Sequence, residues 1–202
     1  LLAGVGIPVT LLDVLPPELT EKEVARGLKV EALEVRNRIV RENMAQLHKA
    51  RPPAFYSRAD VDLISVGNLE DDFDKLATVD WVIEAIVENL EIKRGFFERL
   101  DAIRPQGQIV SSNTSGLPVC ELAASRSADF RRHFLGTHFF NPPRYLQLLE
   151  RIPTAATDPA LLEFFREFAP QRLGQGVVLG KDPPNFIANR ARSAPHKSEL
   201  QS

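Results

Sequence analysis

Short apolar runs alternate with longer amphipathic segments along most of this 202-residue chain. The apolar runs are residues 7–13, 62–68 (the weakest), 80–87, 107–113, 134–140, 145–152 and 176–180. Runs of this length that are bounded by turn residues predict β-strands. Strands that alternate with helices predict an α/β fold, in which a mostly parallel sheet has helices on both faces. The runs after residue 134 are less regular and are compatible with an added antiparallel edge.

Helical periodicity fills the gaps, over residues 20–49, 88–104 and 158–169. The first of these segments is charged and amphipathic, and it predicts a helical hairpin insertion around 20–50. Thr20 and Glu23 have the spacing of a capping box, and Asp158 has the position of an N-cap. Right-handed crossovers place the C-terminal ends of parallel strands along one edge, so we expect ligand-binding residues there.

Charge and cysteine content exclude several classes of protein. The chain has 25 basic and 27 acidic residues without a block of one sign, so neither nucleic acid nor a membrane is expected as a partner. No signal peptide or membrane-spanning run is visible. The single cysteine, Cys120, excludes an internal disulfide and favours a reducing, cytoplasmic compartment. No metal site is expected.

The first predicted strand ends in an acidic residue, Asp13. In dinucleotide-binding folds, a carboxylate at this position accepts hydrogen bonds from the adenosine ribose and repels a 2′-phosphate, which favours NAD over NADP. A solvated aspartate at a strand end is the simpler alternative. The glycine-rich phosphate loop that should precede such a strand is absent, because the Gly-Val-Gly at 4–6 continues to Val9 and into a strand. We therefore expect the first strand, the phosphate loop and most of the first helix to lie upstream of Leu1.

The stretch GTHFFNPPRYLQLLE, residues 136–150, places His138 and Glu150 in two apolar runs that a double proline separates. Core packing requires neither group, although a histidine in a strand can simply be a satisfied core residue. Proton-transfer chemistry uses a histidine that a carboxylate orients. We expect a hydrogen bond between the two side chains on adjacent strands.

Three further stretches place polar side chains where a predicted strand ends or a helix begins. They are GQIVSSNTSG with Ser115, VIEAIVENLEIK with Glu88 and Lys93, and KDPPNFIANR with Asn189. Each has a simpler explanation as a capping turn, a solvated helix start or a surface amide. Their combination and order carry more information than any one of them.

Together, VIEAIVENLEIK, IVSSNTSGL, GTHFFNPPRYLQLLE and KDPPNFIANR resemble the NAD-binding N-terminal domain of the L-3-hydroxyacyl-CoA dehydrogenase family. NLEDDFDKL with HFFNPPRYLQLLE is most similar to long bacterial multifunctional chains that also carry an enoyl-CoA hydratase domain. The resemblance implies a Rossmann-type domain over 1–190 that lacks its first strand and phosphate loop. The sequence then departs from the family: residues 191–202 are a polar tail that does not resemble the family's C-terminal helical domain. We therefore expect this chain to be a fragment that is inactive alone.

The resemblance further implies an activity and a set of roles. The reaction is oxidation of L-3-hydroxyacyl-CoA to 3-ketoacyl-CoA with NAD in fatty-acid β-oxidation, by a homodimer or a multifunctional chain. His138 takes the hydroxyl proton, and Glu150 orients the imidazole. The remaining roles are substrate contact or ring positioning for Ser115 and Asn189, ribose binding for Asp13, and lining of the cofactor site for Glu88, Lys93 and Ser115.

Two other functions remain open from the residues alone. One is another β-hydroxyacid or sugar-nucleotide dehydrogenase, against which HFFNPP with Glu150 argues, since those families use a lysine-centred site. The other is a non-catalytic NAD-binding or crystallin-like structural relative. Retention of Ser115, His138, Glu150 and Asn189 together argues against lost chemistry.

Overall fold

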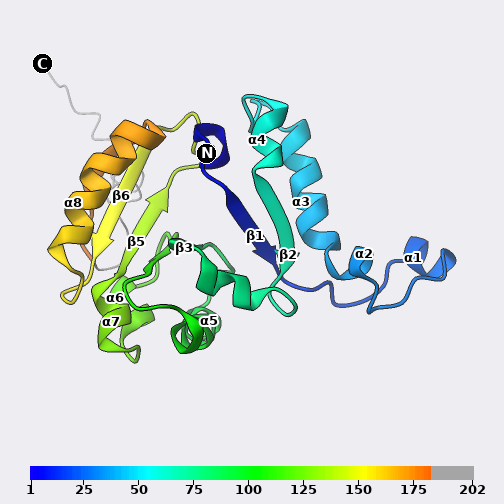
Figure 1. Ribbon diagram of the computed structural model, residues 1–202, viewed down its shortest axis with the longest axis horizontal. Helices are drawn as coiled ribbons and strands as arrows, with labels where there is room; N and C mark the ends of the chain where they lie inside the picture. The colour runs from blue at the N-terminus through cyan, green and yellow to red at the C-terminus, as the bar shows by residue number, and fades with distance from the viewer. Residues whose placement is uncertain (183–202) are drawn as a thin grey trace, which may run out of the picture. The chain divides into compact units, whose positions relative to one another are not determined.

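The computed structural model describes residues 1–182, which form parts of two compact units (Figure 1). Unit 1 consists of residues 1–79 and 141–146, and unit 2 consists of residues 80–140 and those from Gln147 onward. Each unit is described by itself. Within residues 1–182, no helix is both long and apolar enough to cross a membrane.

Unit 1 contains a pair of parallel strands, β1 (Val9–Asp13) and β2 (Ile64–Asn68). Their register sets Asp13 directly beside Asn68, so both strands end at the same edge. The buried Asn68 side chain accepts hydrogen bonds from the backbone N–H groups of Glu70 and Asp71, which fixes the turn after β2. The predicted position of Asp13 at the C-terminal end of a parallel strand is confirmed.

The helical part of unit 1 is divided into short elements. They are η1 (Ala3–Val5), α1 (Glu21–Ala25), α2 (Leu33–Arg36), α3 (Arg38–Lys49), α4 (Arg58–Asp62) and η2 (Phe73–Thr78). The predicted insertion around 20–50 comprises α1, α2 and α3. Gly27, with φ of 68°, interrupts it after α1, because glycine adopts a left-handed backbone without strain. The capping box of Thr20 and Glu23 is present.

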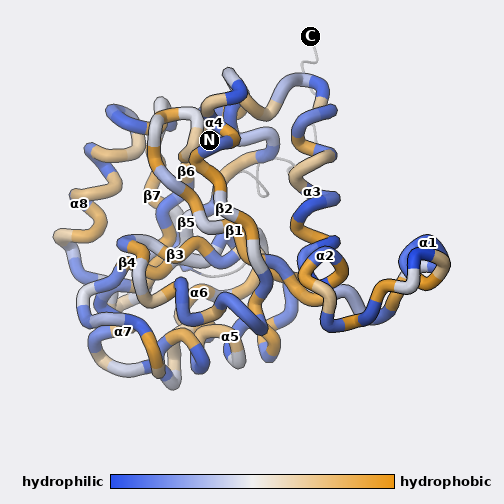
Figure 2. Tube along the Cα trace, turned by 45° about the vertical axis from the view of Figure 1, so that its right-hand side comes forward, coloured by the Kyte–Doolittle hydropathy of each residue, from blue (hydrophilic) through white to orange (hydrophobic). Residues whose placement is uncertain are grey.

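Helix α3 covers the two strands of unit 1 with one apolar face. Val40 and Met44 of α3 are buried, and the helix contacts both β1 and β2. Figure 2 shows blue and orange stretches alternating along α3, as expected for a helix with one face toward an apolar core. This packing also brings Asn43 of α3 to the end of β1.

Unit 2 contains a five-stranded sheet in the order β3-β4-β5-β6-β7. Its strands are β3 (Trp81–Glu84), β4 (Ile109–Ser112), β5 (Phe134–Phe139), β6 (Leu148–Pro153) and β7 (Gly176–Leu179). Strands β3, β4 and β5 are parallel, β6 is antiparallel to β5, and β7 is parallel to β6. The antiparallel addition after residue 134 is therefore present.

Helices cover both faces of this sheet. They are α5 (Leu90–Ile103), α6 (Val119–Ala123), α7 (Ala128–Arg132) and α8 (Pro159–Phe168), which continues into η3 (Ala169–Leu173). Neighbouring residues of β5 point to opposite faces. Phe134 packs against Phe97 of α5 and Phe130 of α7, whereas Leu135 belongs to a core cluster with Phe165 of α8. Asp158 caps α8 as predicted.

The seven predicted strands are all present, but their hydrogen bonds divide them between two sheets. Periodicity shows that a segment is a strand without showing which neighbour it pairs with. Helices α4, α6 and α7 were not predicted, because segments of five residues are too short to display a helical period. The predicted tail at 191–202 lies outside the described residues.

Two adjacent phenylalanines of α8 provide a test of the unit 2 core. Phe165 is fully buried, with its ring 5.0 Å from that of Trp81, whereas Phe164 is 43% exposed. We expect Phe165→Ala to lower the free energy of unfolding by about 3–5 kcal/mol, because it leaves a cavity. Phe164→Ala should lower it by less than about 1 kcal/mol. Urea titration followed by fluorescence of Trp81, the single tryptophan, measures both; equal losses would contradict this core.

Candidate active site

His138 and Glu150 lie directly opposite each other on the antiparallel strands β5 and β6. The His138 Nδ1 atom is 2.8 Å from the Glu150 Oε2 atom, and the two side chains are only 11% and 1% exposed. The predicted hydrogen bond between them is present. Side chains of directly paired residues project from the same face of a sheet, so the strand register itself brings the two groups together.

The Glu150 carboxylate determines which ring nitrogen of His138 faces the site. An ionised carboxylate only accepts hydrogen bonds, so we expect Nδ1 to carry the hydrogen in this contact; Nε2 is the ring nitrogen that faces away from Glu150. The Phe140 ring lies edge-on to the imidazole, with ring centroids 4.6 Å apart. The histidine therefore has a fixed orientation and an apolar neighbour.

Asn113, just past the end of β4, connects three strand ends. Its backbone N–H donates to the Glu84 carbonyl at 2.7 Å, and its side-chain oxygen accepts from the Phe139 N–H at 2.9 Å. The C-terminal ends of β3, β4 and β5 are therefore held in register beside His138. This is the edge at which open α/β sheets bind ligands.

A second buried carboxylate, Glu84, ends β3 and pairs with Lys93 of α5 at 2.6 Å. Both side chains are essentially inaccessible, with exposures of 0% and 1%. Glu84 also accepts a hydrogen bond of 2.5 Å from the Ser112 hydroxyl. A charge this deeply buried is tolerated only when it is paired and hydrogen-bonded, as it is here.

Glu88 binds the turn that follows β4. One of its carboxylate oxygens accepts hydrogen bonds from the Thr114 hydroxyl and from the backbone N–H groups of Ser115 and Gly116, at 2.6–3.1 Å. Burial opposes ionisation of Glu88, but these hydrogen bonds and the nearby Lys93 charge outweigh it and lower the pKa of the carboxyl. Ser115 is exposed at this turn, and its backbone N–H donates to Glu88 at 2.9 Å.

Asp13 is the predicted site residue that belongs to unit 1. Its Oδ1 atom accepts from the Val14 N–H at 2.8 Å, and its Oδ2 atom accepts from the Asn43 side chain at 2.9 Å. The carboxylate is thus oriented at the strand end and keeps acceptor capacity for a hydroxyl donor. Asn189, the remaining predicted residue, lies outside the described residues.

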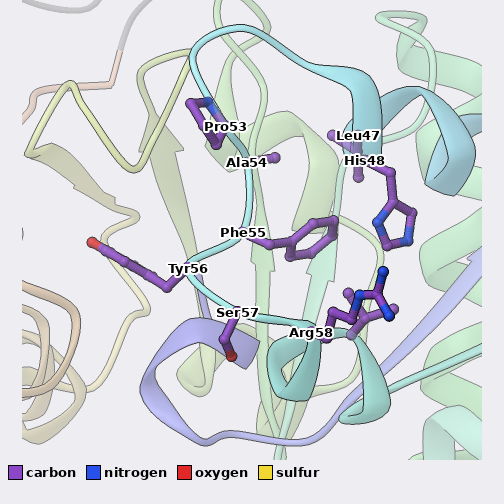
Figure 3. Close-up of a pocket in the computed structure, with 9 residues that line it drawn as sticks. Leu47, His48, Pro53, Ala54, Phe55, Tyr56, Ser57 and Arg58 are labelled. Carbon is purple, nitrogen blue, oxygen red and sulfur yellow. The ribbon is translucent and has the colours of Figure 1, made fainter.

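Unit 1 also contains a pocket of about 270 Å³ between the end of α3 and α4 (Figure 3). Its lining is Leu47, His48, Pro53, Ala54, Phe55, Tyr56, Ser57, Arg58 and Val61. In Figure 3 the side chains of His48, Phe55 and Arg58 point toward one another, and Tyr56 points away. The predicted site residues do not line this pocket.

Sequence reasoning missed Glu84, Ser112, Asn113 and Asn43. One signal was available: Glu84 interrupts the apolar run DWVIEAIV, where a carboxylate has to be buried. Lys93 follows at the start of the next helix and could have been identified as its partner. The contacts of Ser112, Asn113 and Asn43 join elements that are distant in the chain, so local pattern does not contain them.

A search of curated proteins finds relatives that match nearly the whole chain. A "Probable 3-hydroxyacyl-CoA dehydrogenase" from Bacillus subtilis is 53% identical over 94% of this chain, and one from Deinococcus radiodurans is 46% identical over 94%. The chain spans 24% and 51% of these two proteins, respectively.

Solved structures agree with this relationship. The crystal structure of (S)-3-hydroxybutyryl-CoA dehydrogenase from Ralstonia eutropha superposes with a TM-score of 0.67 at 28% identity, covering 93% of this chain and 60% of that one. The fold is therefore the mostly parallel, Rossmann-type α/β fold that the sequence predicts.

A family model described as "3-hydroxyacyl-CoA dehydrogenase, NAD binding domain" matches residues 1–183. That match covers most of the chain and every described site residue, and NAD is the cofactor that its description names. The chain therefore belongs to the 3-hydroxyacyl-CoA dehydrogenase family, as part of its NAD-binding domain.

Proposed function

We propose that the residues of this chain carry out NAD-dependent oxidation of L-3-hydroxyacyl-CoA to 3-ketoacyl-CoA, a reaction of fatty-acid β-oxidation. The observation that carries the proposal is the buried hydrogen bond between His138 and Glu150. Because the chain spans 24% and 51% of two relatives, the activity is proposed for the protein as a whole. NAD binding alone does not require a histidine that a carboxylate orients, and sugar-nucleotide dehydrogenases use a lysine-centred site, so this pair favours the proposal over both alternatives.

The residues fit a dinucleotide cofactor. The carboxylate of Asp13, which Asn43 orients, would accept hydrogen bonds from the adenosine ribose hydroxyls. Glu88 and Ser115 would belong to the wall of the cofactor site, at the C-terminal ends of β3 and β4 and the start of α5. Lys93, which the resemblance also places there, is buried against Glu84 and Glu88 and would support that wall from behind. When bound, NAD supplies the hydride acceptor.

His138 would act as general base toward the substrate hydroxyl. With Nδ1 held by Glu150, Nε2 is the atom that would take the proton from the 3-hydroxyl as the hydride leaves C3. Glu150 would stabilise the imidazolium that forms, as a carboxylate does in a catalytic triad. In the reverse direction, the same Nε2–H would return the proton to the ketone oxygen.

Ser115 and Asn189 complete the proposed set. The Ser115 hydroxyl sits on a turn that Glu88 fixes, so it could donate to the substrate oxygen or position the nicotinamide ring. Asn189 would contribute an amide to the same oxygen. We also propose a cytoplasmic location, which the single Cys120 supports, and a homodimer or a multifunctional chain as the working form.

Replacing the histidine tests the central role. In the full-length protein that carries these residues, His138→Gln should lower kcat by about 10²–10⁴-fold, because a positioned acid–base group is lost. Glu150→Gln should lower kcat by a smaller factor. His133→Gln is the matched control, since His133 contacts the Asp129 carbonyl at 2.9 Å and has no proposed catalytic role. NADH absorbance with acetoacetyl-CoA measures all three, and a fully active His138→Gln protein would refute the assignment.

Cofactor preference tests Asp13. Asp13→Ala should shift the ratio of kcat/KM for NAD and NADP toward NADP by about tenfold or more, because like charges about 4 Å apart near a protein surface repel by about 4 kcal/mol. Asp74→Ala removes an exposed carboxylate of η2 and controls for net charge. Equal use of NAD and NADP by the unmodified protein would contradict the role of Asp13.

A further inference from the structure

Glu84 and Lys93 form a closed set of contacts inside unit 2. The ammonium of Lys93 has three hydrogens. Three acceptors lie within reach: Glu84 Oε1 at 2.6 Å, the Ile86 carbonyl at 3.3 Å and Glu88 Oε2 at 3.3 Å. With 1% exposure, the Lys93 side chain is satisfied by groups of its own chain.

Glu84 is anchored just as fully. Besides Lys93, its Oε1 atom accepts from the Ile86 N–H at 2.7 Å, and its Oε2 atom accepts from the Ser112 hydroxyl at 2.5 Å. Ser112 in turn accepts from the Thr114 N–H at 3.3 Å. One carboxylate therefore connects the end of β3, the start of α5 and the end of β4.

The network reaches the surface at Glu88. The Glu88 side chain is 42% exposed, lies 3.3 Å from Lys93, and holds the backbone of Ser115 and Gly116 through its other oxygen. Two carboxylates and one ammonium leave one negative charge. Because Glu84 and Lys93 neutralise each other at 2.6 Å in the interior, that charge remains on Glu88 at the surface.

We propose that Glu84 is a positioning residue for the cofactor site. Glu84 neutralises and anchors Lys93, and Lys93 in turn determines the position of the Glu88 side chain. Glu88 then holds the 114–116 turn that carries Ser115. Without the Glu84 charge, Lys93 would pair with Glu88 alone and draw it away from the turn. The catalytic consequence rests on the proposed function, whereas the effect on the turn does not.

The key variant is Glu84→Gln, which keeps the size and the acceptor oxygen but removes the charge. By nuclear magnetic resonance on the chain without cofactor, amide hydrogen exchange at Ser115 and Gly116 should become about tenfold faster, within the range of coupling between groups of one network. In the double variant Glu84→Gln/Lys93→Met, which removes both charges, the exchange rates should return toward those of the unmodified chain. Glu163→Gln, on an exposed ion pair of α8, is the matched control.

The outcomes separate this inference from the proposed function. The positioning role would be overturned if Glu84→Gln left the exchange rates of Ser115 and Gly116 unchanged. It would also be overturned if the double variant exchanged as fast as the single variant. Both results hold whether or not the protein is a dehydrogenase. If Glu84→Gln fails to fold, Ser112→Ala takes its place, because it removes one hydrogen bond to Glu84 without changing the charge. We expect a smaller but measurable increase in the exchange rate of the Ser115 and Gly116 amides. An unchanged rate would refute the positioning role.

Kinetics of the full-length protein test the consequence for the cofactor. Glu84→Gln should raise KM for NAD by about tenfold, because it loosens the turn that carries Ser115 at the cofactor site. A loss of kcat with unchanged KM for NAD would contradict this consequence. An unmodified protein without dehydrogenase activity would refute the proposed function, and the exchange measurement would still decide the role of Glu84.

Discussion

The antiparallel register of β5 and β6 is the constraint on which the proposed chemistry depends. It sets His138 opposite Glu150, and the 2.8 Å contact then follows from the strand geometry without help from a flexible loop. A slip of one residue would turn one of the two side chains to the other face of the sheet. Asn113 protects this arrangement, because it ties the end of β5 to the ends of β3 and β4.

Up to residue 182, unit 2 contains two fully buried carboxylates, Glu84 and Glu150, which have different partners. Glu150 faces His138, whose imidazole can accept and donate a proton through its second ring nitrogen, so this pair suits proton transfer. Glu84 faces Lys93, whose ammonium has three acceptors of its own chain within reach. The pair of His138 and Glu150 is suited to catalysis, whereas the pair of Glu84 and Lys93 is suited to holding a turn in place. Removing Lys93 would leave the Glu84 carboxylate in the interior without its charged partner.

Local pattern was sufficient for the strands, the longer helices and the pair of His138 and Glu150. Each of these depends on the residue types within a short segment, such as a histidine in an apolar run. The division into two sheets and the contacts of Ser112 and Asn113 depend on elements that meet only in the folded chain. Glu84 stands between these cases, since its burial was readable from DWVIEAIV but its second contact, to Ser112, was not.

The tautomer of His138 is the most direct measurement of this account. Nitrogen-15 nuclear magnetic resonance of the imidazole, with the ring assigned through His138→Gln, distinguishes a protonated from an unprotonated Nδ1. The account predicts that the neutral ring carries its hydrogen on Nδ1, toward Glu150, and leaves Nε2 as the base. A neutral ring with its hydrogen on Nε2 would contradict it, because that nitrogen could not then accept the proton of the substrate.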